Sequence, residues 1–204
     1  MGGGEGISGS SDDLRRELLA LEADDDRVRA RLAADGSLFG GYHAEMEAVH
    51  RRNARRLREI IAASGWPGRS RVGEDGASAA WRIVQHAIGE PDFVRECLPL
   101  LEDAAARGEA DAAQVAMLVD RVRCLEGRPQ RYGTQLEWND DATAMVPSGT
   151  IEDEAFVDSR RESVGLPPIR WMVPPDPLEP RPKDVKRLRA EMNAWAERVG
   201  WRAP

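Results

Sequence analysis

Histidine and carboxylate side chains inside apolar helical patterns are the residues of this sequence best suited to acid–base chemistry. His86, in the stretch SAAWRIVQHAIG (78–89), borders the apolar stripe of its predicted helix. Asp25 interrupts the middle of another apolar stripe, and Asp120 lies one turn from apolar positions on a third. Because the ordinary pKa of histidine is about 6.5, a histidine oriented by either carboxylate can act as a general base. We therefore predict His86, Asp25 and Asp120 as candidate catalytic residues.

Asn53 is another polar interruption, at the centre of the apolar stripe of the helix predicted over 41–64. An amide or carboxylate buried without partners costs roughly 2–7 kcal/mol on transfer scales, so Asn53 and Asp25 need partners or water. Two interpretations stay open: a structural hydrogen-bond network that fixes helix register, or a polar cavity between facing helices. The functional hypothesis is that Asp25, Asn53 and His86 converge on one enclosed polar space.

The segment RPQRYGTQLEW, at residues 128–138, concentrates neutral hydrogen-bonding groups beside two arginines. Gly133 permits unusual dihedral angles or a close approach. Rigid scaffolds often place recognition residues on such loops, although a loop that only ties helices together is an equally ordinary interpretation. The neutral side chains that we predict to bind substrate are Asn53, Gln85, Tyr132, Thr134 and Gln135.

Histidine spacing gives little support for a metal site. The sequence has three dispersed histidines and no HExxH motif. His43 and His50 share a helix face with Glu47 between them, which could form a two-turn metal-binding ladder, but such ladders are usually solvated surface. Glycine-rich phosphate loops, GxSxG elbows and Cys–His nucleophile motifs are also missing from the sequence. We expect neither a metal nor another cofactor.

Five helices are predicted to position these side chains, from apolar residues that recur with helical periodicity. Ser11 is the expected N-cap of the first helix, residues 69–77 are expected to form a loop, and Pro99 should kink or split the fourth helix. The predicted helices cover about 11–34, 41–64, 77–88, 91–107 and 111–126.

The remainder of the chain has a different character. Residues 128–182 hold most of the prolines and should form an irregular strap, with a short hairpin at 137–149 and a short helix at 151–165. An amphipathic helix over 183–201 follows. We thus predict an all-α helical bundle with a Pro-rich strap and a C-terminal helix. The expected divisions are a flexible tail (1–10), a helical domain (11–173), and a linker with a helical arm (174–204).

Composition narrows the classes of function. The 204-residue chain has a formal net charge of −7, which argues against sequence-independent nucleic-acid binding. No apolar run approaches the roughly 20 residues of a membrane span, and the first residues lack the apolar segment of a secretory signal. Cys97 and Cys124 form no CxxC pair and are expected to be buried free thiols. These features favour a cytoplasmic location.

Several stretches resemble a bacterial family known only as a domain of unknown function. They are LFGGYHAEMEAVHRRNARRLREII, GWPGRSRVGEDGASAAWRIVQHA, PDFVRECLPLLEDA, DRVRCLEGRPQRYGTQLEW and IEDEAFVDSRRESVGLPP. The resemblance covers residues 36–168, extends in our interpretation to the first helix, and implies no particular activity. His43 and His50 fall outside its pattern, which disfavours the metal ladder. Because of the resemblance, Arg121 joins the predicted substrate-binding residues. The matching positions are Asn53, Gln85, His86, Asp120, Arg121, Gln130, Tyr132, Gly133, Thr134 and Gln135.

Two hypotheses of function follow. The first is a cofactor-independent acid–base enzyme (an epimerase or isomerase, a lyase or a hydrolase) that acts on a peptide or small polar metabolite, by association in bacterial specialised metabolism. The second is a non-enzymatic adaptor that uses the strap and the helix at 183–199 to bind a protein partner or a second copy. Its anchors would be exposed Trp171, Trp195 and Trp201.

Overall fold

The protein is an all-α bundle, as predicted, in a computed structural model that describes residues 10–39, 41–177 and 179–203. Residues 1–9 of the expected tail lie outside this range. None of the helices in the described ranges is long and apolar enough to cross a membrane. The elements are α1 (Ser11–Ala34), η1 (Ser37–Phe39), α2 (Ala44–Ser64), α3 (Arg69–His86), α4 (Pro91–Ala106), α5 (Ala112–Leu125), β1 (Leu136–Trp138), β2 (Met145–Pro147), η2 (Glu154–Phe156), α6 (Val157–Ser163) and α7 (Val185–Arg198).

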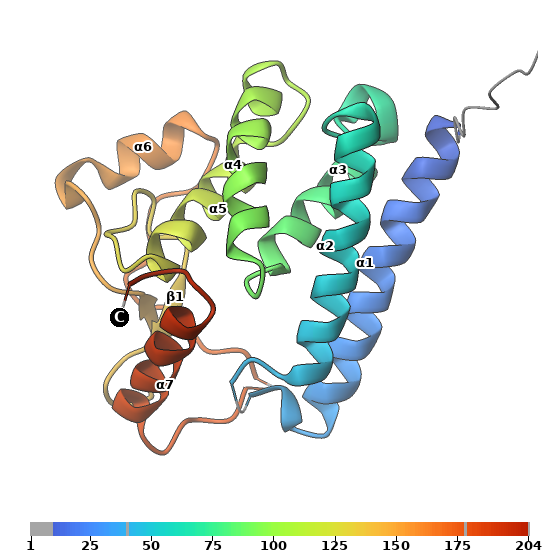
Figure 1. Cartoon of the computed structure of the whole chain (residues 1–204). Helices are drawn as coiled ribbons and strands as arrows, with labels where there is room; N and C mark the ends of the chain where they lie inside the picture. The colour runs from blue at the N-terminus through green and yellow to red at the C-terminus, as the bar shows by residue number, and fades with distance from the viewer. Residues whose placement is uncertain (1–9, 40, 178, 204) are drawn as a thin grey trace, which may run out of the picture.

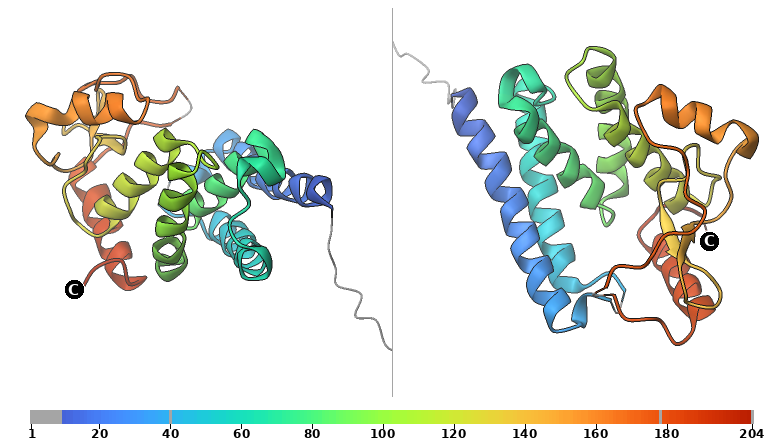
Figure 2. Two further views of the ribbon diagram at one scale, coloured as in Figure 1. Left: turned by 90° about the horizontal axis from the view of Figure 1, so that it is seen from above. Right: turned by 180° about the vertical axis from the view of Figure 1, so that it is seen from behind.

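The helices form two groups that meet in one apolar core. α1 packs against α2 and α3, and α4 packs against α5. Figures 1 and 2 show α1 to α3 at one end of the molecule, α4 and α5 in the middle, and α6 with the β1–β2 hairpin at the other end. Buried residues of all five long helices and of the C-terminal segment, including Leu18, Leu57, Leu101, Leu118 and Trp201, make up the core.

The start of α3 differs from the prediction. Residues 69–77 are helical rather than a loop, with one break at Gly73, whose φ of 73° is left-handed. The turn between α4 and α5 stabilises this helix start: the Glu109 carbonyl accepts a hydrogen bond from Arg69 N–H, and the Glu109 carboxylate accepts one from Ser70 N–H. These caps come from a distant part of the chain, so local sequence does not reveal them.

Two other helix details also differ from the prediction. The N-cap of α1 is Ser10, not Ser11, and it forms a capping box with Asp13. α4 is one helix that continues through Pro99 and is not split there. Its inner face is buried on both sides of the proline, at Cys97 and at Leu101, and this burial offsets the loss of one backbone hydrogen bond.

The C-terminal segment packs back on the bundle. β1 and β2 pair antiparallel, with Leu136 opposite Pro147, as expected for the predicted hairpin. After α7, Trp201 is only 2% exposed and its Nε1–H donates to the Ile88 carbonyl at 2.6 Å. The expectation of an exposed Trp201 is therefore wrong, because its ring completes the core. Trp195 is half-buried against Tyr42, whereas Trp171 is exposed.

Candidate active site

A carboxylate from α1 lies between two imidazoles from α2 and α3. His86 Nδ1 is 2.8 Å from Asp25 Oδ2, and His50 Nε2 is 3.2 Å from the same oxygen. The two imidazole rings are 5.3 Å apart, centroid to centroid. Asp25 and His50 are buried, while His86 is partly exposed. The prediction that Asp25 and His86 meet thus agrees with the structure, and His50 completes the cluster.

Tyr42 fixes the orientation of His50. The Tyr42 hydroxyl is 2.8 Å from His50 Nδ1. Because burial raises the pKa of Tyr42, its hydroxyl keeps its proton and donates it to Nδ1. His50 then carries its own proton on Nε2, which faces Asp25.

The charges in this cluster follow from its burial and its contacts. Burial opposes ionisation of Asp25, but the contacts with His50 and His86 outweigh it and hold the pKa of Asp25 below its ordinary value. Burial lowers the pKa of His86, with Asp25 partly opposing this effect. At neutral pH the cluster is therefore an ionised carboxylate beside a neutral His86, which donates Nδ1–H to Asp25 and leaves the Nε2 lone pair free.

The cluster opens into a cavity of about 920 Å³. Residues of α1, α2 and α3 and residues of α5, β1 and α7 line the cavity. Figure 1 shows the first three helices on the right of the molecule and α5, β1 and α7 to their left. Apolar side chains such as Trp138 and Leu188 share the lining with polar ones. A volume of this size is typical of small-molecule binding sites. Of the predicted substrate-binding residues, Arg121 and Gln135 line this cavity.

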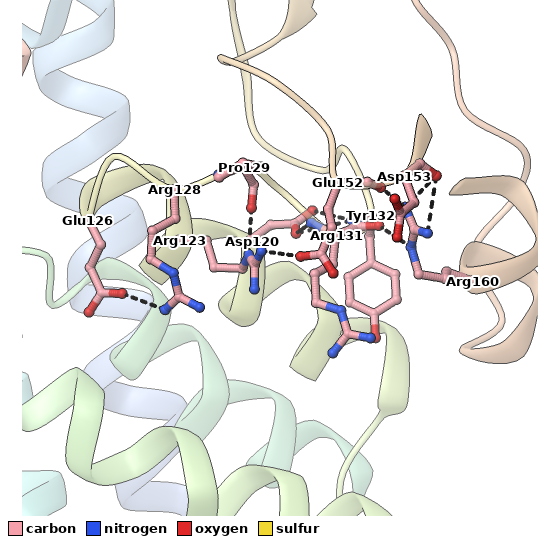
Figure 3. Close-up of polar contacts among 10 residues, drawn as sticks. All are labelled: Asp120, Arg123, Glu126, Arg128, Pro129, Arg131, Tyr132, Glu152, Asp153 and Arg160. Carbon is pink, nitrogen blue, oxygen red and sulfur yellow. Dashed lines mark hydrogen bonds and ion pairs between the residues drawn. The ribbon is translucent and has the colours of Figure 1, made fainter. Parts of the chain in front are cut away.

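Asp120 does not face the cavity but anchors the predicted recognition loop. Its carboxylate accepts hydrogen bonds from the backbone N–H groups of Arg131, Tyr132 and Thr134 and from the Thr134 hydroxyl, at 2.7 to 3.2 Å. Figure 3 shows Asp120 directed toward this loop. Asp120 is completely buried. It therefore stabilises the loop and is not placed to orient His86.

The remainder of the loop has the same structural character. The Gln130 side chain bonds to the backbone at Gln135 and Ser148. Arg123 forms an ion pair with Glu152 and donates to the Pro129 carbonyl, and Arg160 donates to the Arg131 carbonyl, so both arginines hold the loop in place (Figure 3). Tyr132 takes part in these contacts through its backbone, and the Arg131 guanidinium lies over its ring. Thr134 lines a separate cavity of about 200 Å³. These contacts favour the interpretation that the loop ties the helices together over the interpretation that it binds substrate.

Asn53 and Gln85 lie in the core and do not line the large cavity. Asn53 is 1% exposed and its amide donates to the Leu21 carbonyl at 3.0 Å, joining α2 to α1. Gln85 is also buried. The predicted meeting of Asp25, Asn53 and His86 in one space therefore holds for the carboxylate and the imidazole, and Asn53 instead fixes the register of two helices.

The same cluster has the donor atoms of a metal site. One ligand atom each from Asp25, His50 and His86 lies within 4.8 Å of the others. Two imidazole nitrogens with one carboxylate oxygen suit zinc and other transition metals. With a metal on Nε2, His50 would take the other tautomer and donate Nδ1–H to the Tyr42 hydroxyl, a typical outer-shell hydrogen bond. His43 is not in this group: it caps the start of α2 by accepting a hydrogen bond from Glu45 N–H. The described residues thus form no ladder between His43 and His50.

Sequence reasoning missed His50 and Tyr42 as members of the site. One signal was present, since His50 directly follows buried Val49 and lies near the apolar stripe of α2. The three residues of the cluster come from three helices, however, and spacing within one helix cannot show their convergence.

The fold and the site together define an all-α protein with a carboxylate–imidazole cluster in a large cavity. The chain belongs to the family of unknown function DUF6624, whose model matches residues 12–174. No curated protein and no solved structure matches the chain.

Proposed function

We propose that the protein is a cofactor-independent acid–base enzyme that acts on a small polar metabolite or a peptide. His86 is the general base, acting through Nε2, and Asp25 orients it. The observation that carries this proposal is the 2.8 Å contact between His86 Nδ1 and Asp25 Oδ2 at the edge of a cavity. A neutral imidazole with a fixed tautomer can accept a proton at neutral pH.

The cluster is suited to taking a proton from a carbon atom next to a carbonyl or carboxyl group. The C–H bond breaks, its electron pair moves into the substrate as an enolate, and the proton moves to His86 Nε2. Asp25 then stabilises the imidazolium, as the carboxylate does in a catalytic triad. Return of the proton from His86 to a neighbouring atom of the delocalised anion gives isomerisation, and expulsion of a leaving group from that anion gives elimination.

Deuterium incorporation tests this function. The purified protein is incubated in D₂O with a metabolite mixture, and mass spectrometry follows both deuterium gain and product formation. We expect His86→Gln to lower the turnover of any substrate found by about 10²- to 10⁴-fold, the usual contribution of a general base. The matched control is His43→Asn, which changes another cavity histidine but keeps a capping side chain. Full turnover by the His86 variant would refute the proposal.

A second candidate function is metal-dependent hydrolysis, favoured by one specific observation. Asp25 Oδ1 is buried and has no hydrogen-bond partner within the described ranges, beside the three convergent ligand atoms. A metal held there would activate a water molecule. Metal analysis of the purified protein decides between the candidates. About one zinc per chain, lost in His50→Gln, would favour the second candidate, and a metal-free protein that turns over substrate would favour the first.

A cytoplasmic location is part of the same proposal. Cys97 and Cys124 are free thiols, and burial raises the pKa of each to about 12. Such thiols are unreactive and are typical of proteins kept in a reducing compartment.

A further inference from the structure

Arg121 extends from α5 into the lining of the large cavity, and no carboxylate of the described residues pairs with it. Its Nε is buried and lacks a hydrogen-bond partner, and no ion pair of Arg121 occurs among the described residues. Burial lowers the pKa of Arg121 to about 10, so the guanidinium is still charged at neutral pH. Arg121 as a whole is partly buried, and a charge removed from much of its solvent without an ion-pair partner is costly.

The acidic side chains of the cavity are already engaged. Asp25 contacts the two histidines, and Asp26 pairs with Arg82 at 2.7 Å. Glu137 pairs with Arg189 at 3.0 Å, and Glu179 accepts a hydrogen bond from Trp138 Nε1–H. Within the described part of the lining, these four acids leave none for Arg121.

Arg29 adds a second positive charge to the same cavity. It lines the cavity from α1, it forms no ion pair with any described residue, and its charge acts unfavourably on Arg121. Arg29 is exposed to solvent and Arg121 is partly buried, and both place positive charge on the same cavity. Two cations at one cavity attract an anionic ligand.

We propose that the large cavity binds an organic anion, with Arg121 contacting its carboxylate or phosphate oxygens and Arg29 adding to the attraction. This inference rests on the proposed function for the identity of the reacting group, and it names the substrate class. A guanidinium is the side chain best matched to two oxygens of such a group. The apolar lining, from Trp81, Leu136, Trp138, Leu188 and Met192, would hold the hydrocarbon part of the ligand.

The pairing also suits the proposed chemistry. If the anion is a carboxylate next to the acidic C–H group, the negative charge that develops when His86 removes the proton is spread toward the guanidinium. Arg121 and His86 both line this cavity, so one bound ligand can contact both.

Thermal unfolding with three probes tests the anion site. The probes are 4-phenylbutyrate, its uncharged amide 4-phenylbutyramide, and phenyl phosphate, each at constant ionic strength. The variants are Arg121→Met and Arg29→Gln. The matched control is Arg55→Gln, which removes an exposed arginine that does not line the cavity.

We expect at least one anion to raise the melting temperature of the wild type and of Arg55→Gln, and the amide to have little effect. Arg121→Met should lose this shift and bind the anion about 10- to 100-fold more weakly, as for loss of a charge-assisted hydrogen bond. The anion that gives the larger shift identifies the carboxylate or the phosphate class. Without ligand, Arg121→Met should melt no lower than the wild type, because the substitution removes a partly buried charge that has no ion-pair partner among the described residues.

Three results would overturn the inference: no anion shifts the wild type, Arg121→Met shifts equally, or ligand-free Arg121→Met melts far below the wild type. The last result would give Arg121 a structural role. Failure of the acid–base proposal is separate, because His86→Gln should keep anion binding while it loses turnover. If anion binding depends on Arg121 but turnover does not depend on His86, the anion site is supported and the acid–base mechanism is refuted.

Discussion

Asp25 of α1 and His86 of α3 are 61 residues apart in sequence, and their side chains meet at 2.8 Å. The carboxylate opposes the effect of burial on His86 by favouring its protonated form. We therefore expect Asp25→Asn to lower the pKa of His86 further, since an amide cannot stabilise an imidazolium by charge. NMR titration of the His86 ring measures this pKa without a known substrate. An unchanged or raised pKa would show that Asp25 does not control His86.

Acid should destabilise the protein in two steps. The folded pKa of His86 is below its unfolded value of 6.5, so the unfolded chain binds more protons and the free energy of unfolding decreases as pH falls below about 6.5. The folded pKa of Asp25 is also lowered, so its contribution is present above its unfolded pKa of 3.8 and is lost as pH falls through the folded value. Urea unfolding between about pH 5 and pH 8 measures the first step. His86→Asn should flatten that step, and His43→Asn should leave it in place.

Loss of the Asp120 carboxylate should affect stability rather than act directly on chemistry. Asp120→Asn replaces an acceptor of three backbone N–H groups and one hydroxyl with a side chain that presents an amide donor. We expect the free energy of unfolding to fall by about 3 kcal/mol, measured by urea unfolding. Asp141→Asn, at an exposed position on the hairpin, is the control and should change it by less than about 0.5 kcal/mol. A loss below about 1 kcal/mol at Asp120 would contradict its anchoring role.

Gly133 should not tolerate a side chain. Its φ is +64°, and a Cβ there would lie 2.6 Å from Ile169 Cδ1 and 2.8 Å from Ile151 Cδ1. Gly149 has nearly the same φ, +67°, with nothing within 4 Å of its Cβ position. Gly149→Ala should therefore lower the free energy of unfolding by about 1–2 kcal/mol, because only the backbone conformation becomes unfavourable. Gly133→Ala should lower it by about 1–3 kcal/mol more, because of the clash with the isoleucines. Equal losses in the two variants would mean that the isoleucines move aside freely.

Helical periodicity predicted which faces of the helices are buried, and this was enough to place Asp25 and Asn53 inside the bundle. It could not predict which neighbour each polar group would meet. Asp120 illustrates the limit: its partners are backbone N–H groups of a loop, the first of them eleven residues later, and backbone groups leave no mark in a side-chain pattern. Asn53 likewise bonds to a carbonyl of another helix.

Some predictions that rest on local sequence signals are correct, whereas some of the wrong ones concern contacts between residues far apart in the sequence. The hairpin and the C-terminal helix depend on local turn and periodicity signals, and both are present in the structure. The start of α3 depends on Glu109, and the burial of Trp201 depends on Ile88, so both needed knowledge of tertiary contacts.

The wall that α7 contributes lies beyond the segment shared with the family. Val185, Leu188, Met192 and Ala196 border the cavity, whereas the family match ends at residue 174. Asp25, His50, His86 and Arg121 all lie within the match. One part of the cavity wall is therefore encoded outside the family segment, so replacing the last thirty or so residues would reshape that wall while the cluster and Arg121 stay unaltered.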